Sequence, residues 1–201
     1  YSQGILATLD SSTGSSGNID ITIAAGTTVS TLGQSSDAVV ADSRLADPAD
    51  TESVVTITNS GSISTTGVSS DGIDAESSNR VLITSNQVQV SGAGSVGIRG
   101  IVFANEKYYA AQKVIPVVAA ADVAVNGGVS ITTGAVTANN TGRSAVLGGV
   151  YGTGDVDILV TGQVATTGDY SSGVVAFVES GRGTGPPGWI ASKPRTAAAT
   201  C

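Results

Sequence analysis

The chain has 201 residues and a formal net charge of −7, from 9 basic and 16 acidic residues, and it contains no histidine. Because it has no run of basic residues and no apolar stretch of ~20 residues, we expect no nucleic-acid partner and no membrane insertion of this segment. The lack of histidine removes the commonest general base and the commonest metal ligand, which disfavours an enzyme and a metal site.

A short sequence unit recurs six times along the chain. It consists of a small residue, then Ile or Val, then any residue, then Ala or Gly. The small residue stands at Gly4, Ala38, Gly72, Gly97, Ala145 and Gly173. These positions are 34, 34, 25, 48 and 28 residues apart. Such a repeat predicts stacked copies of one structural unit, with insertions in the longer copies.

Two further strands are expected before each unit from the second onward, because β-branched residues alternate there with other residues. The first strand is expected at residues 19–23, 55–57, 81–83, 129–131 and 156–158. The second contains an apolar residue at Val29, Ile63, Val88, Val136 or Val164. It leads into a bend at Gly33, Gly67, Gly92, Asn140 or Gly168. Since Gly and Asn best tolerate positive φ, we expect a left-handed bend there. Each copy therefore predicts a strand, a turn, a strand, a bend and a short strand.

The composition agrees with a narrow, layered core. The chain has two Phe, one Trp and no Met, whereas globular cores are usually built from Leu and aromatic residues. We expect stacks of Val, Ile, Thr and Ala instead, since β-branched side chains suit a pleated surface. The predicted fold is all-β, a parallel β-helix (β-solenoid) of about six irregular coils with loop insertions, over residues 1–180.

Two insertions and a tail interrupt the pattern. Residues 42–53 are acidic and contain Pro48, which predicts a solvated loop. Residues 101–121 hold the candidate ligand-binding residues Phe103, Lys107, Tyr108 and Tyr109, because aromatic side chains on a loop often anchor a partner. The alternative is that this insertion packs its aromatic residues onto the flank of the coils. Residues 181–201, which end in a lone cysteine, predict an irregular tail or an end cap.

Acidic residues gather around the third copy of the unit, at Asp71, Asp74 and Glu76. The other copies hold no acid at the position of Asp74, so we interpret these acids as solvated surface side chains rather than catalytic or metal-binding residues. Arg99, one coil beyond Asp74, is placed to form a cross-coil ion pair with it. No nucleotide-binding motif is present, and we expect no cofactor.

The style of the repeats resembles the passenger domains of bacterial autotransporters, which use type V secretion. The segments 55–67, 69–75 and 160–174 carry this resemblance, which extends over about residues 1–180. It implies a right-handed parallel β-helix that crosses the outer membrane and is displayed at the bacterial cell surface or released. The lack of an internal cysteine is in keeping with passage through the periplasm unfolded. The family shares no catalytic residues, so none is assigned.

The first functional hypothesis is therefore a surface-displayed or secreted passenger that acts as an adhesin or stalk. Its binding loops would meet a protein or glycan of a host cell, the matrix or a neighbouring cell, and self-association of copies is an additional mode. One alternative is a carbohydrate-active β-helix, such as a polysaccharide lyase or a tailspike-like protein. It would need acids clustered across neighbouring coils and an aromatic-lined groove. The other alternative is a purely structural fibre segment.

Overall fold

The computed structural model describes residues 2–9, 17–43, 53–103, 127–139, 141–152 and 154–179. In these ranges the chain forms thirteen strands and no helix, so none of the described segments is a helix that could cross a membrane. Every pair of neighbouring strands is parallel. The predicted all-β class is confirmed.

The strands form two sheets. The first sheet contains, in spatial order, β1 (Ile5–Thr8), β4 (Val39–Ser43), β6 (Ile73–Ser77), β8 (Ile98–Phe103), β10 (Ser144–Tyr151) and β13 (Ser172–Glu179). The second sheet contains β11 (Gly154–Val160), β9 (Gly127–Asn139), β7 (Arg80–Val90), β5 (Val54–Thr65) and β2 (Ile19–Ile23), with β12 (Val164–Thr167) paired to β9 and β3 (Thr28–Thr31) paired to β5.

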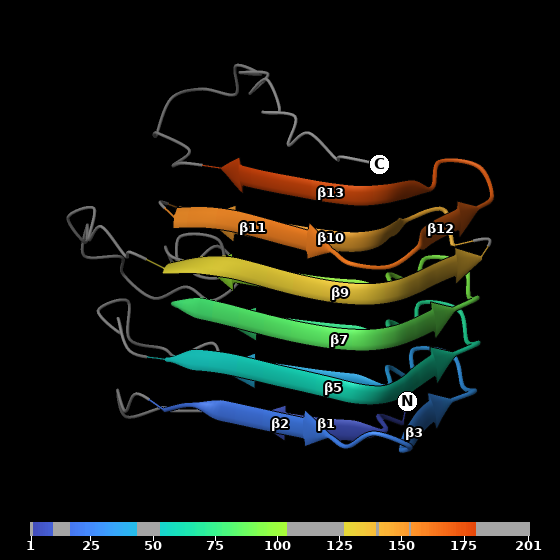
Figure 1. Ribbon diagram of the computed structural model, residues 1–201, viewed down its shortest axis with the longest axis horizontal. Coiled ribbons are helices and arrows are strands. Elements are labelled where there is room, and N and C mark those ends of the chain that lie inside the picture. The colour runs from blue at the N-terminus through green and yellow to red at the C-terminus, as the bar shows by residue number, and fades with distance from the viewer. Residues whose placement is uncertain are drawn as a thin grey trace, which may run out of the picture.

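The chain alternates between the two sheets and adds one layer at each return. We number the layers from 1 to 5 as β1–β3, β4–β5, β6–β7, β8–β9 and β10–β12, and β13 begins a sixth. Figure 1 shows the layers in chain order, from β2 at the bottom to β13 at the top. Strand pairing in the described residues joins each layer to its neighbours, which confirms the predicted stacking of the repeat copies and is consistent with a β-solenoid.

The turn predicted between the first two strands of each copy is present in layers 1 and 5. In layers 2, 3 and 4 the two expected strands form one long strand, β5, β7 or β9. Pairing between β5 and β7 slips between Asn59 and Ser62. There the Asn59 side chain accepts the N–H of Gly61 and donates to Ser85 Oγ, both at 3.0 Å. These bonds satisfy the irregular backbone, so the strand continues without a loop.

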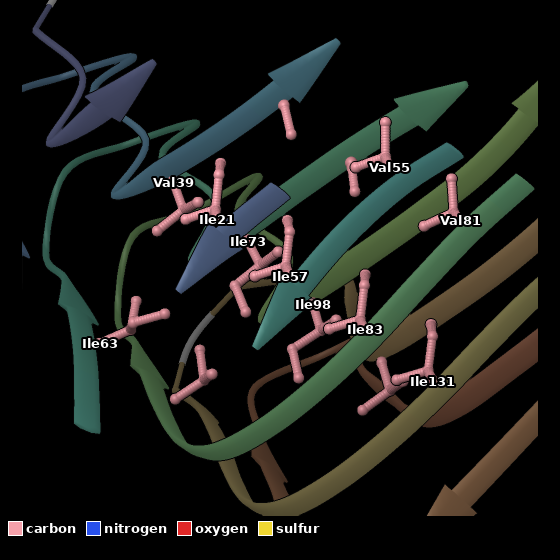
Figure 2. Close-up of a cluster of buried hydrophobic side chains, with 14 of the residues drawn as sticks. Ile21, Val39, Val55, Ile57, Ile63, Ile73, Val81, Ile83, Ile98 and Ile131 are labelled. Carbon is pink, nitrogen blue, oxygen red and sulfur yellow. The ribbon is translucent and has the colours of Figure 1, made fainter. Parts of the chain in front are cut away.

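The core consists of apolar columns that run from layer to layer. The predicted column is confirmed, because its members are successive register partners: Val29, Ile63, Val88, Val136 and Val164. Figure 2 shows Ile21, Ile57 and Ile83 of the second sheet opposite Val39, Ile73 and Ile98 of the first sheet. Full burial of such a side chain contributes about 1.5–3 kcal/mol, so the columns hold the two sheets together without a large aromatic core.

The left-handed residue of each bend lies two positions after the predicted one. Positive φ occurs at Ser35, Ser69, Gly94, Gly142 and Tyr170. Among the predicted positions, Asn140 is outside the described residues and Gly168 does have positive φ. The earlier glycines serve close approach instead: a Cβ on Gly67 would overlap the carbonyl oxygen of Gly33, and a Cβ on Gly92 would overlap that of Gly67.

A ladder of buried serines follows the first three of these bends, at Ser36, Ser70 and Ser95. Ser70 Oγ accepts the N–H of Ser36, and Ser95 Oγ accepts the N–H of Ser70, both at 2.9 Å. All three serines are buried. Because side chain and backbone alternate along this ladder, it holds successive corners in register and positions the residue after each serine: Asp37, Asp71 and Val96.

The irregular regions of the sequence fall largely outside the described residues. β4 extends to Ser43 and β8 extends to Phe103, so the first residues of the insertions expected at 42–53 and 101–121 belong to strands. Residues 44–52 and 104–126 and the expected tail at 181–201 lie outside the described ranges.

Candidate functional site

Charged side chains meet on the outer face of the first sheet, where β6 and β8 pair. Alternation along β6 turns Ile73 and Ala75 into the core and places Asp74 and Glu76 on the opposite face. Arg99 of β8 is the register partner of Asp74. Its Nε and Nη2 donate to the two carboxylate oxygens of Asp74 at 2.8 and 2.6 Å, and Nη2 also donates to Glu76 Oε1 at 2.7 Å. The predicted cross-coil ion pair is confirmed, with Glu76 as an additional partner.

Two further carboxylates lie at the corner that leads into the first sheet, Asp37 before β4 and Asp71 before β6. Asp37 Oδ1 accepts the N–H of Asp71 at 2.6 Å, and Asp71 Oδ1 accepts the N–H of Val96 at 2.7 Å. Asp71 Oδ2 is 3.8 Å from Arg99 Nε. Each carboxylate therefore ties its own layer to the next. We call the five charged residues the acid–arginine cluster: Asp37, Asp71, Asp74, Glu76 and Arg99.

Burial controls the protonation of the corner acids. It raises the pKa of Asp71 from 3.8 to about 7, with the negative charge of Asp74 adding to the rise. The N–H of Val96 and the positive charge of Arg99 oppose the rise without cancelling it. The pKa of Asp37 is also raised, chiefly by burial. Burial lowers the pKa of Arg99, but the hydrogen bonds and charges of its acidic neighbours outweigh this and raise it.

The interpretation of Asp71, Asp74 and Glu76 as solvated surface acids is wrong. Their side chains are 16%, 15% and 9% exposed, because they are packed around one guanidinium. Acids also align between layers, at columns other than that of Asp74. Asp42 is the register partner of Glu76, and Asp37 precedes its unit as Asp71 does. Comparing the copies only at the position of Asp74 therefore missed both aligned pairs, Asp42 with Glu76 and Asp37 with Asp71.

Three aromatic side chains form a row across β8, β10 and β13. Phe103 and Tyr151 are register partners, and their rings stack with 5.4 Å between centroids and 9° between planes. Tyr151 and Phe177 meet edge to face, with centroids 5.2 Å apart and an angle of 66°. Tyr170 is the one other aromatic residue in the described part of the chain. We call Phe103, Tyr151 and Phe177 the aromatic row; each is partly exposed.

Local register explains the position of the aromatic row. Phe177 is the register partner of Gly149, and a Cβ on Gly149 would overlap the Phe177 ring. The glycine therefore leaves space for the ring over β10. Arg99 and Phe103 are four residues apart on β8, so strand alternation places them on the same face. The acid–arginine cluster and the aromatic row thus share the outer face of the first sheet.

Of the candidate binding residues from the sequence, the structure places Phe103 in the aromatic row. Lys107, Tyr108 and Tyr109 lie outside the described residues. Tyr151 and Phe177 were not identified from the sequence. Tyr151 follows the small residue of its unit by six positions, as Phe103 does, so alignment of the copies would have identified it. Phe177 follows its own small residue by four positions and gives no such signal.

No protein-family model matches the chain, and no curated protein or solved structure shows a significant match. Nor do His, Cys, Asp and Glu residues in the described ranges form a group of three or more that could hold a metal ion. The outer face of the first sheet, with its charged cluster and aromatic row, is therefore the candidate functional surface.

Proposed function

We propose that the chain is a parallel β-helix passenger, displayed at the bacterial cell surface or released, that acts as an adhesin. The layers form a rigid support, and the outer face of the first sheet binds a glycan of a host or neighbouring cell. The support for this proposal is the all-parallel stacking of repeat copies, in which each layer is held mainly by its neighbours. Right-handed coiling is part of the same proposal.

The observation that carries the binding proposal is the aromatic row. The chain is poor in aromatic residues, with 4% Phe, Trp and Tyr, yet three of the four in the described ranges meet on one face. They are partly exposed rather than buried in the core. Aromatic side chains offer a large contact area at a small entropic cost, and they are frequent among the residues that dominate binding energy.

A glycan suits this face for two reasons. The C–H faces of sugar rings are apolar and pack flat against aromatic rings, while sugar hydroxyls form hydrogen bonds with carboxylates and guanidinium groups. The aromatic row and the acid–arginine cluster supply both kinds of group on one sheet face. Phe103, which belongs to this face, is also the one candidate binding residue from the sequence that lies within the described ranges.

Binding of the purified chain to an array of bacterial and host surface glycans tests the proposal. Tyr151→Ala removes the central ring of the aromatic row, and we expect its affinity for the bound glycan to fall about tenfold or more. Phe177→Ala should show a similar loss. The matched control is Tyr170→Ala, because Tyr170 is 95% exposed and lies outside the row. Circular dichroism of each variant would verify folding.

Three outcomes would contradict the glycan proposal. One is a wild-type chain that binds no glycan and no cell surface, which would favour a structural fibre segment. The second is a Tyr151→Ala variant that binds as the wild type does. The third is equal loss in Tyr151→Ala and Tyr170→Ala, which would mean that any exposed ring serves.

A carbohydrate-active enzyme is the second candidate, because acids and an arginine cluster across neighbouring layers on the same sheet face as the aromatic row. Asp71, with its pKa raised to about 7, has the protonation behaviour of a general acid or base near neutral pH. Incubation with acidic and neutral polysaccharides, followed by detection of reducing ends or unsaturated products, tests this candidate. Activity that is lost in Asp71→Asn would support it, and intact polysaccharides would argue against it.

A further inference from the structure

The corner acids tie successive layers together, because each side-chain carboxyl accepts a backbone N–H of the next layer. Asp37 accepts the Asp71 N–H from the next layer, and Asp71 accepts the Val96 N–H from the layer after that. Both bonds connect side chain to backbone between layers, so a change in either carboxylate acts directly on the stacking. The buried serine ladder runs beside them and holds the same corner.

Negative charge exceeds positive charge around Asp71. The charged groups that act on it are Asp37 from the corner before β4, Asp74 from β6 and Arg99 from β8, and Glu76 of β6 contacts the same Arg99. Arg99 is already bonded to both Asp74 and Glu76, and it reaches Asp71 only at 3.8 Å. An ionised Asp71 therefore adds a further negative charge to a group that contains one positive charge.

We propose that the acid–arginine cluster is a proton-sensitive joint between layers 2, 3 and 4. With Asp71 protonated, the corner packs without excess charge and the layers stack tightly. With Asp71 ionised, the unfavourable burial of its charge, together with repulsion from Asp74, loosens the corner at β4, β6 and β8. This device goes beyond the proposed glycan binding, because it concerns the stacking of layers, and its test needs no glycan.

The direction of the pH effect follows from linkage. The pKa of Asp71 is about 7 in the folded chain, whereas its ordinary value, which applies to the unfolded chain, is 3.8. The folded state therefore binds the proton more tightly than the unfolded state. The resulting stability is fully present below pH 3.8 and is lost as pH rises through about 7. Histidine, which usually titrates between pH 5 and 8, is absent from the chain. The window between pH 5 and 8.5 is therefore suited to detecting this effect.

The test is thermal unfolding of the full chain between pH 5 and 8.5, for the wild type, Asp71→Asn and Asp155→Asn. Asparagine keeps an oxygen that can accept the Val96 N–H, but it cannot ionise. We expect the wild-type Tm to fall by about 5 °C across this window, and the Asp71→Asn Tm to stay nearly constant. Asp155 is an exposed carboxylate on β11, so its variant should follow the wild type.

A wild-type Tm that does not fall, or an Asp71→Asn Tm that falls as much as that of the wild type, would overturn the proposal. If Asp71→Asn does not fold, titration of the side-chain carboxyl carbons of the wild type by NMR gives the answer. A midpoint near 7 for Asp71 supports the joint, whereas a midpoint near 4 rules it out.

Discussion

Glycine is required at the bend positions Gly67 and Gly92, because the backbones of successive layers are in close contact there. Gly67→Ala would place a methyl group against the carbonyl oxygen of Gly33. Because that oxygen belongs to the backbone and cannot rotate away, the two layers must separate. We expect the free energy of unfolding to fall by about 1–3 kcal/mol, measured by denaturant titration followed by circular dichroism.

The control for this prediction is Gly173→Ala. The nearest atom to an added Cβ there is Val164 Cγ1, at the ordinary contact distance of 3.7 Å. Alanine already occupies this position in two other copies, at Ala38 and Ala145. The substitution should leave stability unchanged or raise it by about 0.4–1 kcal/mol, through the unfolded chain. A similar loss for both variants would show that close approach is not the role of Gly67.

At the scale of single residues, the sequence indicated which positions matter more reliably than it indicated their physical role. The glycine column was recognised from the repeat, but left-handed geometry falls two residues later, at residues such as Ser69. Nothing in the local sequence signals the contact with Gly33, which arises only when layers stack. The Asp74–Arg99 pair was predictable because both occupy the same position in neighbouring copies. The burial of Asp71 was not, because it depends on the three-dimensional corner.

Within a strand, inward and outward positions should differ sharply in their effect on stability. On β7, Ile83 is buried between the sheets whereas Thr84 is exposed. We expect Ile83→Ala to lower the free energy of unfolding by about 2–5 kcal/mol, because it leaves a cavity in a core column. Thr84→Ala should change it by less than about 0.5 kcal/mol. Denaturant titration of both variants checks this, and equal effects would contradict the assigned face of β7.

At the scale of elements, the apolar columns were predictable because period-two alternation and the copy spacing agree. Strand boundaries were less predictable from the sequence. The joining of two expected strands into β5, β7 or β9 depends on neighbours in the adjacent layers, which pair with the chain on both sides of the bend. Among the described strands, the end layers of the second sheet pair on one side, and there β2 and β3, or β11 and β12, remain separate. Tertiary pairing therefore overrides the local turn signal in the middle of the stack.

At the scale of the whole molecule, stacking makes the number of layers a variable that the fold tolerates. Insertion of a second copy of residues 145–172 after Ser172 should fold, because each new strand meets a neighbour with the register it already has. A folded layer of 28 residues (the spacing between Ala145 and Gly173) should raise the calorimetric enthalpy of unfolding by about 20 kcal/mol near 60 °C, at ~0.7 kcal/mol per residue.

The control for this insertion is the same copy without the residue that corresponds to Leu147. Removal of one residue shifts the rest of that strand by one position, so its apolar side chains turn from the core to the outer face. We expect this variant to gain little or no enthalpy of unfolding. Equal gains for both insertions would mean that the added segment folds without pairing to its neighbours. A gain that requires the intact copy would establish that the layer, rather than the whole chain, is the unit in which this fold is built.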